Sequence, residues 1–514
     1  MAGFRPSILV LILILVFAAF FRLWQLDTVP PSLWPDEAIN ANTAIGILDT
    51  KTFQVFYPEN QGREGLFFLL IAFAFSIFGI SIWSFKLVPA LAGIFTVLGQ
   101  YLLARELFRK LSASGSRTIA LLSSFFLAIS FWHINFSRIG FRAILTPLIL
   151  TFSFYFFFRG LRTKKIWDFL LSGLIFGLGF YTYISFRMAV FLLAFALIFW
   201  FLVALKEKWA AKFFVSAALL LLTVFIVGLP MGIYFLENPE HFVVRALGVS
   251  VFKQENPIKA FFQSLARHLL MFNFSGDPNW RHNLSGFPQL SLAAGIFFLI
   301  GAIWAIWQIV VSIKREFPEN LAEIGSFLFL FVWLFVLLLP SALTVEGIPH
   351  ALRSIGVIPV AYLFAGLGAY LAYQRVKNKP IFKGISFLLL VMMVFSSFIL
   401  YFFVWAKSPQ LANAFTTRFT DLGKELNALP VEIKKYVIQN EGDLPAEVPK
   451  FIQRTAKRAD TIYIQPWEVQ IIDFSPGDFV FIMNKEIHFL DPVRERFPRG
   501  ILHQRERILI YEIR

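Results

Sequence analysis

Two adjacent carboxylates, Asp36 and Glu37, stand in the sequence Pro30-Pro-Ser-Leu-Trp-Pro-Asp-Glu-Ala38, directly after the first apolar segment. Carboxylates close to a membrane surface suit general-base chemistry, because partial burial and neighbouring arginines tune their pKa. Asp36 also follows a proline at the start of a helical stretch, where an aspartate often caps the helix. The two roles are compatible, and the sequence leaves both open.

A second charged pair, Arg63 and Glu64, lies in the sequence Glu59-Asn-Gln-Gly-Arg-Glu-Gly65, just before a short apolar stretch. If this pair is an exposed ion pair, it contributes little to stability. At the edge of a membrane-embedded helix, the same side chains can instead face a polar cavity. We therefore count Glu64 as a candidate catalytic residue and Arg63 as a candidate substrate-binding residue.

Arginine and histidine side chains recur in several other segments that border the membrane. Any single arginine can snorkel to lipid headgroups, but four such sites on one face favour a shared cavity. Guanidinium groups gathered there would bind a phosphate through bidentate, charge-assisted hydrogen bonds. Asp277 stands in a Gly-Asp-Pro-Asn sequence that is also typical of a simple turn. The further candidates for substrate or phosphate binding are Arg138, Arg142, Arg187, Asp277, Arg281, His282, His350 and Arg353.

The composition of the chain is that of a membrane protein. Of its 514 residues 58% are hydrophobic, 65 are phenylalanine and only 15% are charged, whereas soluble domains carry about 25% charged residues. The net charge of +15 comes from Lys and Arg in short loops between apolar runs, as the positive-inside rule produces, so we expect no nucleic-acid partner. The chain has no cysteine, which excludes disulfides, thiolate nucleophiles and Cys-ligated metals.

Eleven apolar runs are long enough to cross a bilayer, which takes roughly 20 residues. The first is followed by no small-residue cleavage site, so we predict a retained transmembrane helix. The stretch 66–79 is shorter. If it does not cross, the basic clusters between later runs all face the cytoplasm; if it crosses, all face outward, against the charge rule. The predicted spans are 8–24, 84–104, 117–134, 142–159, 166–183, 188–205, 212–235, 290–311, 324–341, 354–373 and 384–405.

This topology predicts a cytoplasmic N-terminus in the cell membrane, with 66–79 as a juxtamembrane or re-entrant helix on the outer side. The main outer loops are 25–65 and 236–289, and the tail is also outside. The tail contains an amphipathic helix near 412–428, and strand-like runs at 436–439, 461–465, 478–483 and 507–513. We therefore predict an α-helical polytopic membrane domain, 1–405, and a small extracytoplasmic α/β domain, 406–514.

With these elements placed, about the first 400 residues resemble the glycosyltransferase C superfamily. The likeness is to bacterial relatives of protein O-mannosyltransferases and of the lipid A aminoarabinose transferase. The chain departs from these relatives at Arg63-Glu64-Gly65, where proline-containing versions are expected. The resemblance rests on the Asp36-Glu37 pair, FGISIWSFK at 78–86, LARELF at 103–108, Ser137-Arg138 and the segment from Gly276-Asp277 to Asn283.

The resemblance implies a hexosyl- or pentosyltransferase that uses a polyprenyl-phosphate sugar and transfers the sugar, with inversion, to an extracytoplasmic protein, lipid or glycan. It implies that Asp36 is the general base, with Glu37 beside it and Glu64 near the second membrane element. The positive charge of the arginine-rich segments would stabilise the leaving phosphate. A divalent cation, Mg²⁺ or Mn²⁺, is compatible with this chemistry, with Asp36 and Glu37 as the residues to hold it.

Two other functions remain open from the sequence. A transporter or flippase for a lipid-linked or polar solute would also have many spans and charges at membrane depth. Transporters usually show two similar halves with broken helices near the midplane, whereas the charges here gather at one face and no internal repeat is evident. A catalytically inactive relative that serves as a binding subunit is the third possibility, and the intact Asp36-Glu37 pair argues against it.

Overall fold

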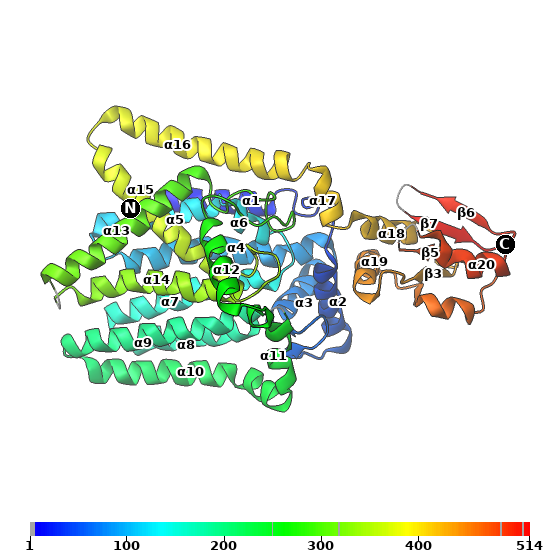
Figure 1. Ribbon diagram of the computed structural model, residues 1–514, viewed down its shortest axis with the longest axis horizontal. Helices are drawn as coiled ribbons and strands as arrows, with labels where there is room; N and C mark the ends of the chain where they lie inside the picture. Colours follow the sequence, from blue (N-terminus) through cyan, green and yellow to red (C-terminus); the bar gives the residue numbers. More distant parts are fainter. Residues whose placement is uncertain (1–5, 249, 317–318, 484–485, 506–507) are drawn as a thin grey trace. The chain divides into compact units, whose positions relative to one another are not determined.

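The structure is a computed structural model that describes residues 6–248, 250–316, 319–483, 486–505 and 508–514 (Figure 1). The chain forms two compact units. The first, which we call the membrane unit, contains the described residues up to Trp24, with Gln54–Phe67 and Pro89–Trp405. The second, which we call the sheet unit, contains Gln25–Phe53, Phe68–Val88 and Ala406–Arg514.

The membrane unit is almost entirely helical. Two short paired strands, β1 (Phe56–Tyr57) and β2 (Arg63–Glu64), interrupt it. The helices α3 (Leu66–Phe78) and α4 (Ile82–Leu107) each have residues in both units. The other helices are α1 (Pro6–Leu23), α5 (Ala113–Ala128), α6 (Phe131–Phe136), α7 (Leu145–Thr163), α8 (Ile166–Leu178), α9 (Ala189–Lys206), α10 (Ala210–Glu237), α11 (Pro239–Gly248), α12 (Pro257–Leu270), α13 (Leu292–Glu316), α14 (Leu321–Ala342), α15 (Ile358–Val376) and α16 (Pro380–Ile399).

The helices confirm the predicted polytopic membrane fold. Among the described residues, 8 helices are long and apolar enough to cross a membrane, and they match eight of the predicted spans. The predicted spans 8–24 and 166–183 correspond to shorter apolar helices. The span predicted at 117–134 ends early, because α5 has 16 residues and stops at Ala128. The helix α3 has 13 residues, or about 20 Å at 1.5 Å per residue, which is shorter than the roughly 30 Å hydrocarbon core.

Glycines let α13 and α15 approach closely along the membrane unit. A Cβ atom added to Gly301 would lie 2.0 Å from the carbonyl oxygen of Phe364, and one added to Gly368 would lie 1.9 Å from that of Phe297. Within a bilayer, helix association depends on such close packing, since lipid tails are as apolar as the helices. This contact holds α15 in the interior of the unit. The loop that contains His350 leads directly into the start of this helix.

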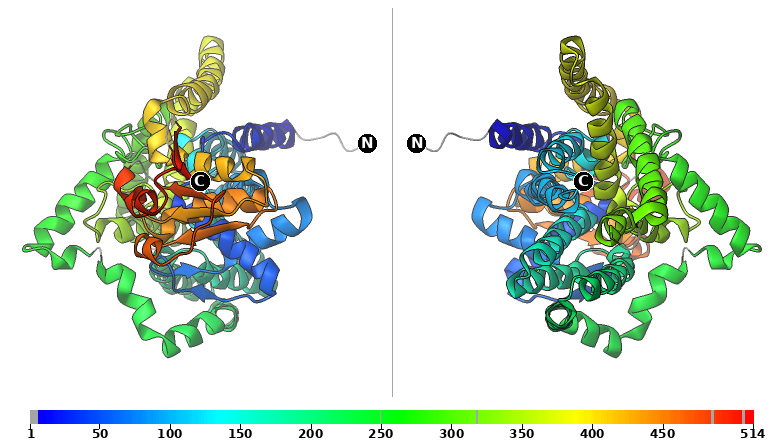
Figure 2. Two further views of the ribbon diagram at one scale, coloured as in Figure 1. Left: turned by 90° about the vertical axis from the view of Figure 1, so that its right-hand side faces the viewer. Right: turned by 90° about the vertical axis from the view of Figure 1, so that its left-hand side faces the viewer.

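The sheet unit contains a five-stranded mixed sheet with the strand order β4-β3-β5-β7-β6. Its orange and red strands are visible in the left view of Figure 2. β3 is parallel to β4 and β5, and β7 is antiparallel to β5 and β6. The strands are β3 (Lys435–Ile438), β4 (Thr461–Ile464), β5 (Phe479–Ile482), β6 (Ile501–Gln504) and β7 (Leu509–Glu512); the helices are α2 (Pro35–Thr50), α17 (Pro409–Ala414), α18 (Thr417–Ala428), α19 (Asp443–Thr455) and α20 (Asp491–Arg496).

Both faces of this sheet are covered. Tyr436 and Ile438 pack with Val493 of α20 on one face, and the alternate residues Val437 and Phe481 are also fully buried. The four predicted strands of the small α/β domain are confirmed as β3, β4, β5 and β7, although position 507 lies outside the described residues. The sequence did not predict β6, whose residues Ile-Leu-His-Gln lack a strand-like alternation.

The Asp460 carboxylate contacts two basic side chains, those of Arg458 and Lys435, at the start of the parallel strands β3 and β4. It accepts hydrogen bonds from Arg458 Nε at 3.0 Å and Arg458 Nη2 at 2.6 Å. It also forms an ion pair with the Nζ atom of Lys435, whose side chain is fully buried. The hydrogen bonds from Arg458, together with Lys435, hold the pKa of Asp460 well below its usual range.

Replacing Asp460 with asparagine is expected to lower the free energy of unfolding of the sheet unit by about 1.5–3 kcal/mol at pH 7, because the charge-assisted contacts of its carboxylate with Arg458 and Lys435 are lost. A carboxyl group whose pKa is lowered by folding stabilises the fold above its unfolded pKa of about 3.9, and this stabilisation is lost as the pH falls. The wild-type unfolding temperature should therefore fall more steeply than that of Asp460→Asn below about pH 4. Equal slopes in a thermal unfolding series from neutral to acidic pH would contradict this account.

Candidate functional site

The carboxylate of Asp277 organises a loop between α12 and α13 of the membrane unit. Its Oδ1 atom accepts a hydrogen bond from the Asn279 backbone N–H at 2.8 Å, which closes the turn predicted from the sequence. Its Oδ2 atom accepts the Ala351 backbone N–H at 2.7 Å and lies 2.9 Å from His282 Nδ1. Since an ionised carboxylate only accepts hydrogen bonds, His282 Nδ1 carries the proton and its Nε2 atom is the basic nitrogen.

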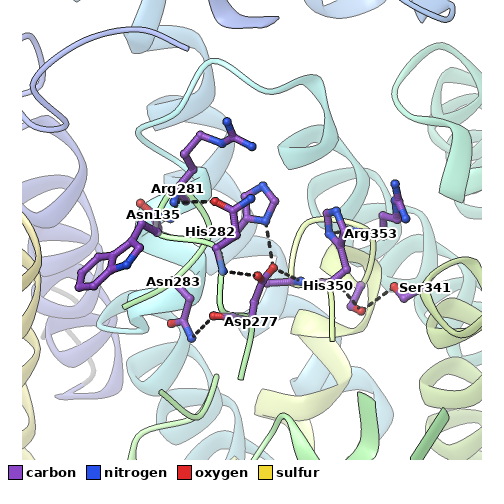
Figure 3. Close-up of polar contacts among 12 residues, drawn as sticks. Asn135, Asp277, Arg281, His282, Asn283, Ser341, His350 and Arg353 are labelled. Carbon is purple, nitrogen blue, oxygen red and sulfur yellow. Dashed lines mark hydrogen bonds and ion pairs between the residues drawn. The ribbon is translucent and has the colours of Figure 1, made fainter. Parts of the chain in front are cut away.

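Two histidines from distant loops meet at this carboxylate (Figure 3). The rings of His282 and His350 have centroids 4.9 Å apart. The possible ligand atoms of Asp277, His282 and His350 all lie within 4.8 Å of one another, with Asp277 and His282 buried and His350 partly buried. The sequence singled out all three residues as substrate-binding candidates, and the structure brings these three together.

A third histidine, His268 in α12, supports His350 and was not predicted from the sequence. The His350 backbone N–H donates to His268 Nε2 at 3.1 Å, so His268 Nδ1 carries the proton and donates to the Ser264 carbonyl oxygen at 2.8 Å. Burial lowers the pKa of His268, which favours this neutral form. The only sequence signal for His268 is its place on the buried face of the amphipathic helix α12.

This set of side chains suits a transition-metal ion better than Mg²⁺. Imidazole nitrogens with one carboxylate are typical ligands of Zn²⁺ or Mn²⁺, whereas Mg²⁺ prefers oxygen ligands. Asp277 Oδ2 already accepts two hydrogen bonds, so in this arrangement it orients His282 as carboxylates do beside metal-binding histidines. The sequence had placed a possible divalent cation at Asp36 and Glu37, whereas the group of potential ligands found among the described residues is Asp277, His282 and His350.

Glu64 and Arg142 form a second polar contact in the membrane unit. Arg142 Nε lies 2.7 Å from Glu64 Oε2, and both side chains are largely buried. Arg142 Nη2 also donates to the Gly62 carbonyl oxygen at 3.1 Å. Gly62 has φ +89°, a conformation that favours glycine, and Phe56 packs against it. The neighbouring Phe141 contacts the His282 ring, with centroids 6.5 Å apart, so the backbone segment that carries Arg142 borders the histidine cluster.

Most of the other predicted arginines bind protein groups. Arg187 donates to the Phe242 carbonyl oxygen at 2.7 Å and stacks on the Phe242 ring. Arg353 forms an ion pair with Glu346 at 2.7 Å, and Arg63 Nη2 lies 3.5 Å from Glu59 Oε2. The Arg281 carbonyl oxygen accepts a hydrogen bond from Asn135 Nδ2 at 2.6 Å, which ties the 276–283 loop to α6.

Arg138, which the sequence placed among the phosphate-binding candidates, caps the end of α1. Its Nη1 and Nη2 atoms donate to the carbonyl oxygens of Phe21 at 2.9 Å and Trp24 at 2.8 Å, and its guanidinium lies 5.1 Å from the centroid of the Phe402 ring. Helix ends leave carbonyl groups without intrahelical partners, and a cation there satisfies them. The fully buried Arg138 is therefore positioned to stabilise the fold.

Replacing Arg138 with lysine is expected to remove part of this cap and to lower the free energy of unfolding by about 1.5–3 kcal/mol, the range for hydrogen bonds to charged groups. Thermal unfolding in detergent would measure this effect. The exposed Arg109 provides a matched control, because Arg109→Lys should leave the unfolding temperature unchanged. An Arg138→Lys protein with unchanged stability but a much higher KM for its donor would instead assign Arg138 to substrate binding.

In the sheet unit, Glu37 rather than Asp36 caps the start of α2. Glu37 Oε2 accepts the backbone N–H of Trp34, the N-cap residue, at 2.9 Å. The Glu37 side chain is fully buried, whereas Asp36 is partly exposed in the first helical turn. The capping role that the sequence allowed for Asp36 thus belongs to its neighbour. Lys86 is also fully buried in this unit and donates to the Pro30 carbonyl oxygen at 3.3 Å.

A cavity of about 370 Å³ borders the 276–290 loop of the membrane unit. Its walls come from the ends of α5, α13, α15 and α16 and from Asn283, Phe287 and Gln289, and none of the lining residues is charged. Asn283 also donates to the Asp277 carbonyl oxygen at 3.3 Å. The loop that carries Asp277 and His282 therefore also forms part of the wall of an uncharged cavity.

Comparison with known proteins places this fold. A family model described as dolichyl-phosphate-mannose-protein mannosyltransferase matches residues 66–234. An uncharacterized protein from Aquifex aeolicus is 28% identical over 145 residues, and the aligned segment spans 28% of that relative and 27% of this chain.

Solved structures match over nearly the whole chain. ArnT from Cupriavidus metallidurans bound to undecaprenyl phosphate has a TM-score of 0.59 at 11% identity, covering 99% of this chain and 98% of that one. The archaeal oligosaccharyltransferase AglB from Archaeoglobus fulgidus, in complex with an inhibitory peptide and a dolichol-phosphate, has a TM-score of 0.53 at 14% identity, covering 94% and 70%. Together with the family model, these matches confirm the resemblance to glycosyltransferase C proteins; at such identities the structures establish the fold.

Proposed function

We propose that this chain, which shares its fold with ArnT and AglB, is a membrane glycosyltransferase. It takes a sugar from a polyprenyl-phosphate-linked donor and transfers it, with inversion, to an extracytoplasmic acceptor. The observation that carries the proposal is the Asp277–His282–His350 cluster, with Asp277 and His282 buried and His350 partly buried, in a fold whose solved examples hold undecaprenyl phosphate and a dolichol-phosphate. In this proposal residues 1–405 form the catalytic membrane domain, and 406–514 form an extracytoplasmic domain.

The histidine cluster would bind the phosphate of the donor. Negative charge grows on the leaving phosphate as the glycosidic bond breaks, and preorganised donors or cations at that position stabilise the transition state. Asp277 fixes the tautomer of His282 through the 2.9 Å contact at Nδ1, so a protonated His282 presents Nε2–H as a donor. In the alternative form with neutral histidines, a divalent ion held by His282 and His350, with Asp277 orienting His282, would supply positive charge to the same phosphate.

Asp36 would act as the base on the acceptor side. Because Glu37 is held by the Trp34 backbone N–H, its role is to fix the first turn of α2, and Asp36 is the partly exposed carboxylate of the pair. In an inverting displacement the acceptor hydroxyl attacks the anomeric carbon while its proton passes to the base. Asp36 would take this proton, and the polyprenyl phosphate would leave with the bonding electrons.

The uncharged cavity beside the 276–290 loop would accept hydrocarbon from the donor lipid. Its lining contains no charged residue, so it is unsuited to the phosphate group and suited to an isoprenoid segment. Asn283, which lines this cavity, donates a hydrogen bond from its Nδ2 atom to the Asp277 carbonyl oxygen. Binding of the isoprenoid chain and binding of the phosphate would therefore both act on the 276–290 loop.

The proposed orientation can be tested with single cysteines, because the natural chain has none. Ser114 and Ser475 are both exposed; the predicted topology places Ser114 in the cytoplasm and Ser475 outside. In intact cells, a membrane-impermeant maleimide is expected to label Ser475→Cys and to label Ser114→Cys only after permeabilisation. Labelling in the opposite order would invert the topology and remove the extracytoplasmic acceptor from the proposal.

The catalytic proposal is tested by incubating the purified protein in lipid nanodiscs with a panel of polyprenyl-phosphate sugars and candidate acceptors. Phosphorus NMR follows the conversion of the phosphodiester donor into polyprenyl phosphate, and proton NMR gives the anomeric configuration of the product. We expect release from at least one donor and an inverted product. A retained configuration would contradict the direct displacement, and movement of intact donor between leaflets without release would favour a flippase.

A further inference from the structure

A second, polar cavity of about 330 Å³ lies within the sheet unit. Its walls come from the second half of α2, from α19 and from the start of β4. At this size the cavity is at the lower end of the range for small-molecule sites, roughly 300–1,000 Å³. It is therefore large enough for one compact ligand, and nothing in the transfer chemistry described above makes use of it.

Gly46 keeps this cavity open. It lies inside the helix α2, where glycine costs about 0.5–1 kcal/mol relative to alanine. A Cβ atom added at Gly46 would meet no atom within 4 Å, so close packing does not require glycine at this position. Its helical backbone does not require glycine either. The missing side chain leaves volume in the wall of the cavity.

Each charged group of the cavity already has an oppositely charged partner, either in the lining or directly beside it. Arg454 Nη2 lies 3.1 Å from Asp49 Oδ2, and Lys450 Nζ lies 2.9 Å from Glu447 Oε1. The third lining cation, Arg458, binds Asp460. An anionic ligand would compete with these carboxylates for the cations, and a cationic ligand would compete with the cations. A neutral ligand with several hydroxyl groups can donate to the carboxylates and accept from the cations while the pairs stay intact.

The uncharged polar side chains are held in place before any ligand binds. Gln453 Nε2 donates to Thr461 Oγ1 at 2.6 Å, and the Tyr463 hydroxyl donates to Gln453 Oε1 at 3.1 Å. Asn42 Nδ2 donates to Glu447 Oε2 at 2.8 Å. Such preorganisation reduces the entropy lost on binding. The cavity offers donors and acceptors in fixed positions around a small, mostly polar space.

We propose that this cavity binds a neutral sugar residue and serves as a docking subsite for a glycan-bearing acceptor. The acceptor role rests on the proposed transferase function; the sugar binding itself does not. At 100° per residue, the positions of Asn42, Gly46 and Asp49 on α2 are turned by roughly a quarter to two fifths of a revolution from Asp36. The subsite would therefore bind the acceptor on a side of α2 different from the side that carries Asp36, the proposed base.

The test uses the full-length protein in lipid nanodiscs and saturation-transfer NMR with calorimetry. The probes are glucose, galactose, mannose, N-acetylglucosamine and their disaccharides, with glucuronic acid and mannose 6-phosphate as anionic counterparts. At least one neutral saccharide is expected to bind with a Kd of about 1 mM or tighter, and its anionic counterpart at least about tenfold more weakly. Gly46→Trp, which fills the cavity, is expected to weaken binding at least about tenfold, or 1.4 kcal/mol.

Gly384→Trp is the matched control, since Gly384 is also a helical glycine whose added Cβ would meet no atom within 4 Å. It should bind saccharide as the wild type does. Gln453→Leu, which keeps the side-chain size, tests the same cavity if Gly46→Trp does not fold. Binding that neither cavity variant weakens, preference for the anionic sugars, or no binding of any neutral probe would overturn the proposal. Saccharide binding without donor turnover would overturn the transferase function and leave the sugar site standing.

Discussion

Asp36→Asn is expected to reduce the rate of sugar transfer by roughly 10²–10⁴-fold, the usual contribution of a positioned general base. Asparagine has nearly the same shape as aspartate but cannot take the proton of the acceptor hydroxyl. Because Glu37 makes the capping contact of α2, the substitution leaves that cap in place. The initial rate of product formation at saturating donor and acceptor measures the effect, and the unfolding temperature reports whether the fold is retained.

Asp27 provides the control for this substitution. It lies in the same first loop of the sheet unit and is exposed, so Asp27→Asn should transfer sugar at the wild-type rate. If Asp36 were only an acidic residue in the first turn of a helix, its loss would cost about 0.3–1 kcal/mol of stability and no rate. Wild-type transfer by Asp36→Asn would therefore remove Asp36 from the mechanism.

Asp277→Asn is expected to lower kcat/KM for the donor by roughly 100-fold. This is the upper end of the effects seen when a residue that hydrogen-bonds the far ring nitrogen of a ligand-binding histidine is replaced. The Asp277 carboxylate accepts hydrogen bonds at both oxygens, from Asn279 on one side and from His282 and Ala351 on the other. An amide has one acceptor oxygen, so its NH₂ group must face N–H donors on one of these sides. If the NH₂ group faces His282 and Ala351, His282 loses the contact that fixes its tautomer. In either orientation the loop loses negative charge beside two histidines.

Glu255→Gln is a suitable control because Glu255 is exposed just before α12, in the same predicted outer loop. It should leave kcat/KM unchanged. Asp277→Asn could also act by loosening the loop, so the donor panel should be repeated with His282→Gln, which keeps the carboxylate. If Asp277→Asn reduces the unfolding temperature but not kcat/KM, and His282→Gln changes neither, the cluster is a structural contact and binds no phosphate.

Much of the fold followed from the sequence because apolar length and charge placement have simple physical causes. The long spans and four of the five strands of the C-terminal sheet were predicted, since each is marked by an apolar run or an alternating pattern. The early end of α5 at Ala128 was not predicted, because the apolar run continues past it while Ser130 starts a new helix by capping His133. The membership of α2 in the unit that also holds the C-terminal sheet depends on contacts distant in sequence, such as Asn42 with Glu447.

The candidate site was predictable as a set of residues but not as an arrangement. Asp277, His282 and His350 were singled out by type and by position beside the membrane, and they form one cluster. The same reasoning could not separate them from Arg138, because a cation that caps a helix end and a cation that binds phosphate look alike in a sequence. His268 had no signal beyond helix amphipathicity, since its role depends on a backbone N–H 82 residues away.

The most direct test measures donor binding and donor release in the same nanodisc samples of wild type, Asp36→Asn and Asp277→Asn. The donor is the polyprenyl-phosphate sugar selected from the panel, with its acceptor present, and the readout is polyprenyl phosphate. We expect wild type to bind and release, Asp36→Asn to bind the donor normally but release it slowly, and Asp277→Asn to bind it weakly. Equal release by all three proteins, or no release by the wild type from any donor with any acceptor, would contradict the account.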